Sequence, residues 1–190
     1  SAEVGNLELT WLVPLSLIGT ICGWLYFVSE HASEALAHAI GERPVVKAML
    51  AGLALAICGT VLPYTMFAGE TQADVLMETY LTIPTGVLIA TGLVKAMLTP
   101  ALINLGWRGG HFFPVIFSGV SLGYGLAILT GADPVFCVAV CTASTMGAVM
   151  RQPVMVVGLL LMCFPLKGII CMIIAAVIAA GIPLPKSLRK

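Results

Sequence analysis

Two stretches of the sequence, residues 9–29 and 48–69, contain no charged side chain. Each is long enough to cross a lipid bilayer as a helix, which takes about 20 residues. Of the 190 residues only 9% are charged and 59% are hydrophobic, whereas a soluble domain carries about 25% charged residues. A small soluble domain cannot bury that much apolar surface. The sequence therefore predicts an integral membrane protein and excludes a soluble globular, disordered or coiled-coil chain.

Charge-free segments continue through the rest of the chain, but most are shorter and proline interrupts them. They cover residues 79–94, 96–107, 109–132, 134–150, 152–166 and 168–185. Proline ends the helix before it and suits the first turn of the next one. We therefore predict an all-α, multi-pass membrane protein with two ordinary spanning helices, followed by several short, tilted or broken ones. Broken helices at membrane depth line cavities and are typical of transport sites.

The polar connections predict how the chain crosses the membrane. Residues 30–38 are polar and helical in pattern, so they extend the first spanning helix into water; Gly41 ends it and Pro44 begins the next helix. Residues 41–47 carry two basic side chains, whereas residues 70–78 carry three acidic ones spaced on one face of a short helix. Because basic loops face the cytoplasm, we expect the N-terminus and residues 70–78 outside and residues 41–47 and the C-terminus inside.

Acidic and basic side chains are equal in number, nine of each, but they are unevenly distributed. After residue 79 the sequence has one acid, Asp133, against seven bases: Lys95, Arg108, Arg151, Lys167, Lys186, Arg189 and Lys190. If an ion moves through this part of the chain, an anion is therefore favoured; alternatively, each cation is an interfacial anchor. The balanced total gives no nucleic-acid-binding surface.

The six cysteines are single residues in apolar runs, and no pair has the spacing of a zinc site or a disulfide framework. We interpret them as small packing residues and expect neither a metal nor a cofactor. There is no nucleophile–base pair or carboxylate dyad, so we expect no enzymatic activity. The glycine pairs Gly19–Gly23 and Gly119–Gly123 predict close helix contacts in a packed bundle.

One stretch combines several features of an anion site: Gly106-Trp107-Arg108-Gly109-Gly110-His111-Phe112-Phe113-Pro114. Its glycines allow close approach to the backbone, Pro114 suits a helix start, and an apolar run follows through Leu129. A helix that begins within the bilayer leaves its first N–H groups without helical partners, and its dipole places about half a positive charge there. The stretch therefore predicts anion binding. The alternative is a simple Gly-Pro turn between two helices at the interface.

The same residues resemble the CLC family of chloride channels and chloride/proton antiporters. Gly110-His111-Phe112-Phe113-Pro114 matches the family's G-x-F-x-P signature. Three further segments are similar to the family at corresponding places: the run with Lys95 near its middle, the run from Phe117 to Gly123, and the run from Gly147 through Arg151 to Pro153. The resemblance extends from about residue 9 to the C-terminus and covers the second of the family's two antiparallel halves.

The resemblance implies that residues 1–190 form the C-terminal half of an inverted-repeat transporter, which moves chloride or a similar small anion as a channel or an anion/proton antiporter. It implies a homodimer with one pore per subunit, and helices at about 153–164 and 166–181 on the dimer face. The N-terminal half, from the same gene or a separate chain, would supply the gating glutamate. The expected location is the lipid bilayer of a prokaryotic cell membrane.

The resemblance also implies which residues form the site. The backbone N–H groups of His111 and Phe112 would bind the anion, with Phe113 a lesser candidate. The loop and the helix start would be shaped by Gly109, Gly110 and Pro114.

Three charged or titratable side chains carry further expectations. A protonated His111 would strengthen anion binding at low pH; alternatively, it is a neutral histidine bonded to a neighbouring loop. Lys95 and Arg151 are candidate pathway cations, because charges at membrane depth are functional by default. We place Arg151 at the interface.

The sequence departs from the family pattern at its end. Many members close the membrane domain with a G-x-P-L-Y pattern whose tyrosine hydroxyl caps the central anion, and here Pro185 stands in that place. The departure implies weaker chloride coordination and looser proton coupling. Leu161 likewise stands where many members have a glutamate.

Two other functions remain open: half of a non-CLC secondary transporter for a small organic anion, and a non-transporting membrane scaffold.

Overall fold

All regular structure in the described part of the chain is helical, which confirms the all-α prediction. The computed structural model describes residues 5–66, 70–164, 169–185 and 188. The α-helices are α1 (Asn6–Ile40), α2 (Pro44–Val61), α3 (Glu70–Thr79), α4 (Thr85–Asn104), α5 (Phe112–Thr130), α6 (Pro134–Met150), α7 (Pro153–Leu160) and α8 (Ile169–Gly181). Short 3-10 helices, Pro63–Thr65 and Tyr80–Thr82, follow α2 and α3. Of the cations counted above, Lys167, Lys186, Arg189 and Lys190 lie outside the described residues.

The α1–α2 hairpin has the predicted ends. Helix α1 is 35 residues long and stops at Gly41, which has a positive φ of 70° and donates its N–H to the His38 carbonyl at 3.1 Å. Pro44 is the first residue of α2, where its fixed φ and missing N–H are tolerated. Gly41 and Pro44 thus end and begin these helices as the sequence predicted.

The prediction of two ordinary spanning helices was wrong. Four described helices are long and apolar enough to cross a membrane: α1, α2, α4 and α5. The predicted segments 79–94 and 96–107 are separated at Lys95 because a charge in lipid is costly. In the structure, α4 continues through Lys95 and Pro100. Only 4% of the Lys95 surface is exposed, and its Nζ donates to the Thr65 carbonyl at 2.6 Å. Because the protein supplies this partner, the helix does not have to break to solvate the charge.

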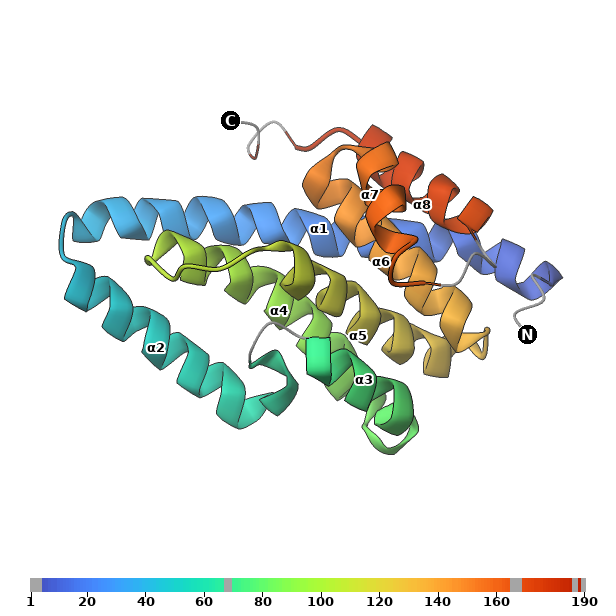
Figure 1. The fold of residues 1–190 in the computed structure, drawn as a ribbon, viewed down its shortest axis with the longest axis horizontal. Helices are drawn as coiled ribbons and strands as arrows, with labels where there is room; N and C mark the ends of the chain where they lie inside the picture. Colours follow the sequence, from blue (N-terminus) through green and yellow to red (C-terminus); the bar gives the residue numbers. More distant parts are fainter. Residues whose placement is uncertain (1–4, 67–69, 165–168, 186–187, 189–190) are drawn as a thin grey trace.

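Helix α5 lies at the centre of the bundle, between α4 and α6 (Figure 1). Helix α1 packs against α4 and α6 and passes behind α6 in this view, and α8 packs on α6. In its most apolar window 72% of α5 is buried inside the protein, compared with 6% of α2, which stands away from the bundle as the outer arm of the hairpin (Figure 1). The start of α5 is therefore held by a packed helix, while α2 offers most of its surface to its surroundings.

The predicted glycine contacts are present between α5 and α6. A Cβ atom added at Gly119 would lie 2.5 Å from the Cα of Thr142, and one added at Gly123 would lie 2.5 Å from the Cα of Val138. These are backbone atoms, so a side chain at either glycine would push the two helices apart. Gly19 and Gly23 of α1 make similarly close contacts with α6. These glycines thus determine how closely α5 and α1 pack against α6.

The first of the two helices after α6 is shorter than expected. We predicted a helix at about 153–164, but α7 ends at Leu160 and a turn follows. The N–H of Leu161 donates to the Val157 carbonyl at 2.9 Å, and residues 161–163 form the turn. For the expected helix at 166–181, the structure describes α8 from Ile169, and residues 166–168 lie outside the described part.

Candidate functional site

The glycine-rich loop begins where α4 closes with a complete C-terminal cap. The N–H of Gly106 donates to the Ile103 carbonyl and the N–H of Trp107 donates to the Leu102 carbonyl, both at 3.0 Å. Gly106 has a φ of 98°, a region that residues with a Cβ rarely adopt. This pair of bonds is the Schellman arrangement, which satisfies the last carbonyls of the helix. It turns the chain out of α4 and into residues 107–111.

The loop ends at the start of α5, where backbone donors are left over. His111 precedes the helix, with φ −91° and ψ −12°, and makes no side-chain capping bond. The first helical bond runs from the Val115 N–H to the His111 carbonyl at 3.2 Å. Pro114 has no N–H, so the N–H groups of His111, Phe112 and Phe113 are the donors at this helix start without a helical partner. The arrangement presents three N–H groups and the positive end of the helix dipole to a ligand.

The side chains at this end have different surroundings. The rings of His111 and Phe112 are stacked, with centroids 4.6 Å apart and planes 20° from parallel. Phe113 is half exposed and lines a separate cavity between α3, α5, α6 and residues 163–164, together with Asp74 and Met77. The imidazole is therefore held beside Phe112, whereas Phe113 borders a cavity that neither of them lines.

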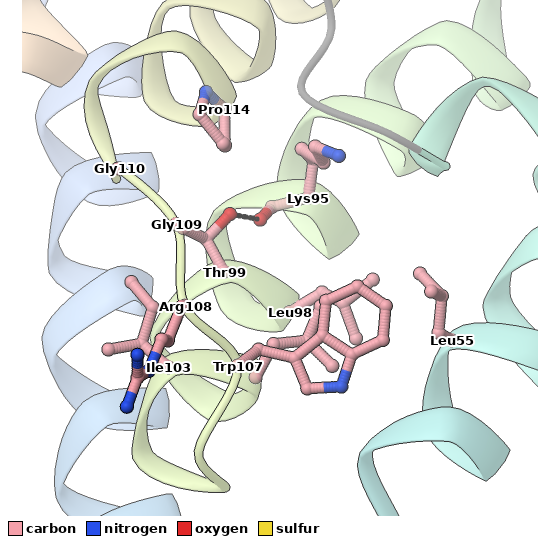
Figure 2. A pocket seen from close by; sticks show the side chains of 11 residues that line it. Leu55, Lys95, Leu98, Thr99, Ile103, Trp107, Arg108, Gly109, Gly110 and Pro114 are labelled. Atoms are coloured by element: carbon pink, nitrogen blue, oxygen red, sulfur yellow. Dashed lines mark hydrogen bonds between the residues drawn. The ribbon is translucent and has the colours of Figure 1, made fainter. Parts of the chain in front are cut away.

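A cavity of about 230 Å³ lies beside the loop (Figure 2). Its walls come from four parts of the fold: α2, α4, the loop and the start of α5. The lining residues are Leu55, Lys95, Leu98, Thr99, Leu102, Ile103, Trp107, Arg108, Gly109, Gly110 and Pro114. The cavity thus brings Lys95, from the middle of α4, next to three of the predicted loop residues.

Lys95 and Arg151, the two candidate pathway cations, are in different environments. The Lys95 ammonium points away from Gly109 and Gly110, toward the connection after α2, where it reaches Thr65 (Figure 2). Arg151 follows the last residue of α6 with a positive φ of 56°, and its Nη1 donates to the Ile182 carbonyl at 3.1 Å. Arg151 ties the end of α6 to the end of α8 and does not line the cavity. A pathway role for either cation stays a prediction.

Sequence reasoning missed several residues that border the loop. Trp107 and Arg108 line the cavity, and their place inside the glycine-rich motif was the available signal. Thr99 also lines it, and its hydroxyl donates to the Lys95 carbonyl at 2.8 Å. Thr99 follows Lys95 by one helical turn, so the four-residue spacing could have pointed to it. Within the described residues, no three His, Cys, Asp or Glu side chains gather as a metal site would require.

Together these features define an all-α integral membrane protein in which a helix starts from a glycine-rich loop beside a cavity. The chain belongs to the voltage gated chloride channel family, whose model matches residues 1–183. The fold is similar to a crystal structure of a CLC-type fluoride/proton antiporter, with a TM-score of 0.79 and 20% sequence identity over 96% of this chain. The chain spans 45% of the length of that antiporter. No curated protein sequence matches the chain.

Proposed function

We propose that the chain is the C-terminal half of a CLC-type transport unit and binds chloride or a similar small anion at the start of α5. The observation that carries the proposal is the set of N–H groups on His111 and Phe112, with Phe113 a lesser candidate, which have no helical partner. A helix N-terminus with free donors is an anion site, because the dipole and the N–H groups act on the same ligand. His111 contributes through its backbone and its place before the helix.

The surroundings of the loop suit a small ion. The positions of a Cβ atom on Gly109 and Gly110 meet no other atom within 4 Å, so the backbone is open to approach on that side. Neither Asp nor Glu lines the cavity beside the loop, whereas Asp74 lines the separate cavity that Phe113 borders. In a low-dielectric membrane environment these donors act more strongly than they would in water.

A second half is part of the proposal. Residues 106–110 are exposed in this chain. An ion bound there would keep water on its open side, so the site could not discriminate between ions by the cost of removing their hydration shells. We assign the missing wall, and the gating glutamate that the family resemblance implies, to an N-terminal half that is not in this chain. Pro185, which has no hydroxyl group, implies a weaker central site and leaves the choice between channel and antiporter to experiment.

The proposed assembly is a homodimer in the lipid bilayer of a prokaryotic cell membrane. Its support is an apolar face on α7 and α8, where Val154, Ile170 and Val177 are exposed. Such a face is typical of helices that pack against another protein copy or against lipid. The oligomeric state in lipid nanodiscs distinguishes the two, because a dimer interface predicts two copies per particle.

Anion flux in liposomes tests the proposal. The full-length protein, meaning this chain together with the proposed N-terminal half from the same gene or a separate chain, should carry chloride or fluoride. A carboxylate such as acetate should compete poorly. The isolated chain of 190 residues should carry no selective flux, because half of the pathway wall is absent. Strong competition by carboxylates would favour the organic-anion transporter, and a full-length protein without flux of any anion would favour the scaffold. Selective flux from the isolated chain would contradict the half-transporter proposal.

A further inference from the structure

The last residue of α4 is hydrogen-bonded to the polar end of α1. The side-chain amide of Asn104 donates to the Glu30 carbonyl at 3.1 Å and to the Ser33 Oγ at 2.9 Å. Ser33 is only 6% exposed, so its hydroxyl is held inside this contact. The two partners are more than 70 residues away in the sequence. The contact therefore joins two elements that meet only in the folded chain.

Asn104 stands immediately before the loop of the candidate anion site. Leu105, the next residue, is buried, and the cap at Gly106 and Trp107 follows. Within the described residues, no side-chain hydrogen bond connects residues 106–111 to another helix. The position of the loop therefore depends on its two ends, which are the end of α4 and the start of α5.

We infer that Asn104 and Ser33 are positioning residues that hold the end of α4, and with it residues 106–111, against α1. In its consequence for anion binding, this inference rests on the proposed function. Asn104 does not line the cavity beside the loop; it borders a separate polar cavity of about 250 Å³ with Glu34, His38 and Lys47. It therefore acts on the site through the backbone of the loop and not by touching the anion.

The same pair of helices offers a matched control. Ser29 of α1 donates its hydroxyl to the Met97 carbonyl of α4 at 2.5 Å, two turns before the loop. Ser29→Ala removes a hydrogen bond between α1 and α4 without touching the end of α4. Asn104→Asp keeps the side-chain shape, removes the amide donor and places a carboxylate against the Glu30 carbonyl. Ser33→Ala removes the other partner.

The test is amide hydrogen exchange of the Gly106 and Trp107 N–H groups, which are hydrogen-bonded in the cap of α4, in the full-length protein, with chloride affinity measured in parallel. Because a neutral hydrogen bond is worth a modest amount net, Asn104→Asp and Ser33→Ala should each speed exchange there by about two- to tenfold. The double variant should exchange no faster than Asn104→Asp alone, because Asn104→Asp already removes both bonds of this contact. Ser29→Ala should leave exchange at Gly106 and Trp107 unchanged.

Exchange and affinity separate the inference from the proposed function. Unchanged exchange in Asn104→Asp, or an equal rise in Ser29→Ala, would overturn the inference. Faster exchange together with weaker chloride binding would support both claims. Faster exchange with unchanged chloride affinity would support the positioning role of Asn104, and it would contradict the placement of the anion at this loop.

Discussion

At the scale of single residues, Gly106 is the glycine before α5 whose backbone conformation requires glycine. Gly106 has a φ of 98° in the cap of α4, whereas Gly109 and Gly110 have no positive φ. The Cβ positions of Gly109 and Gly110 are also open. An alanine would therefore be strained at Gly106 and not at Gly110, although all three glycines belong to the same motif. At Gly110 we propose that glycine leaves room for the anion.

We predict that Gly106→Ala destabilises the protein by about 1–2 kcal/mol, because a Cβ is disfavoured in the left-handed region. Gly110→Ala should leave the unfolding temperature unchanged and weaken chloride binding only by crowding the ion. Thermal unfolding of the full-length protein, with and without chloride, measures both effects. Equal destabilisation by the two variants would show that the backbone geometry assigned to Gly106 is incorrect.

At the scale of elements, the approach of α5 to α6 decides where the start of α5 lies. Gly119→Ala would place a methyl group 2.5 Å from the Thr142 Cα, and overpacking of this kind costs about 1–3 kcal/mol. Gly52→Ala is the matched control, since Gly52 lies in the exposed α2 and its Cβ position meets no atom within 4 Å. It should be neutral or add up to about 1 kcal/mol, because alanine favours helix.

Equilibrium unfolding in detergent measures this pair of variants. We expect Gly119→Ala to unfold at a lower denaturant concentration than the wild type and Gly52→Ala to unfold at the same or a higher one. If Gly119→Ala is as stable as the wild type, the two helices are not packed as closely as the structure describes.

The sequence predicted helix ends well where glycine or proline determines them, and less well where a distant partner does. Gly41 and Pro44 bound the first hairpin through their own backbone preferences. The continuity of α4 through Lys95 depends on the Thr65 carbonyl, which is 30 residues away and has no local signal. The spacing of residues along the sequence does not predict the contact of Asn104 with α1 either. The motif at residues 106–114 was identified, but which of its glycines is conformationally required depends on a cap that only the fold reveals.

At the scale of the whole molecule, the orientation in the membrane is the main expectation still to be measured. The charge pattern predicts that Glu42, between α1 and α2, is cytoplasmic and that Asp74, on α3, is outside. Both side chains are exposed, so a cysteine at either place can react with a reagent. The exposed native Cys163 has to be replaced by serine first.

An impermeant maleimide added to intact cells should modify Asp74→Cys and leave Glu42→Cys unmodified until the membrane is opened. This result would place the polar end of α1, with the Asn104 contact, on the cytoplasmic side. Modification of Glu42→Cys alone in intact cells would show that the orientation is the opposite of the predicted one. The folded arrangement of the helices would be unaffected, because their packing does not depend on which side is outside.

The most direct test of the central claim removes one backbone donor. Replacing Phe112 by its α-hydroxy analogue turns the amide into an ester, which eliminates the N–H and keeps the side chain. The same exchange at Val135, in the first turn of α6, removes an N–H away from the proposed site and is the control. Chloride affinity of the full-length protein is measured by calorimetry for both esters and for His111→Ala. Because a hydrogen bond to an ion is worth about 1.5–3 kcal/mol, we predict at least tenfold weaker binding for the Phe112 ester, and affinity near wild type for the Val135 ester and His111→Ala. Unchanged affinity in the Phe112 ester, with loss of binding in His111→Ala, would contradict a site built from the backbone of α5.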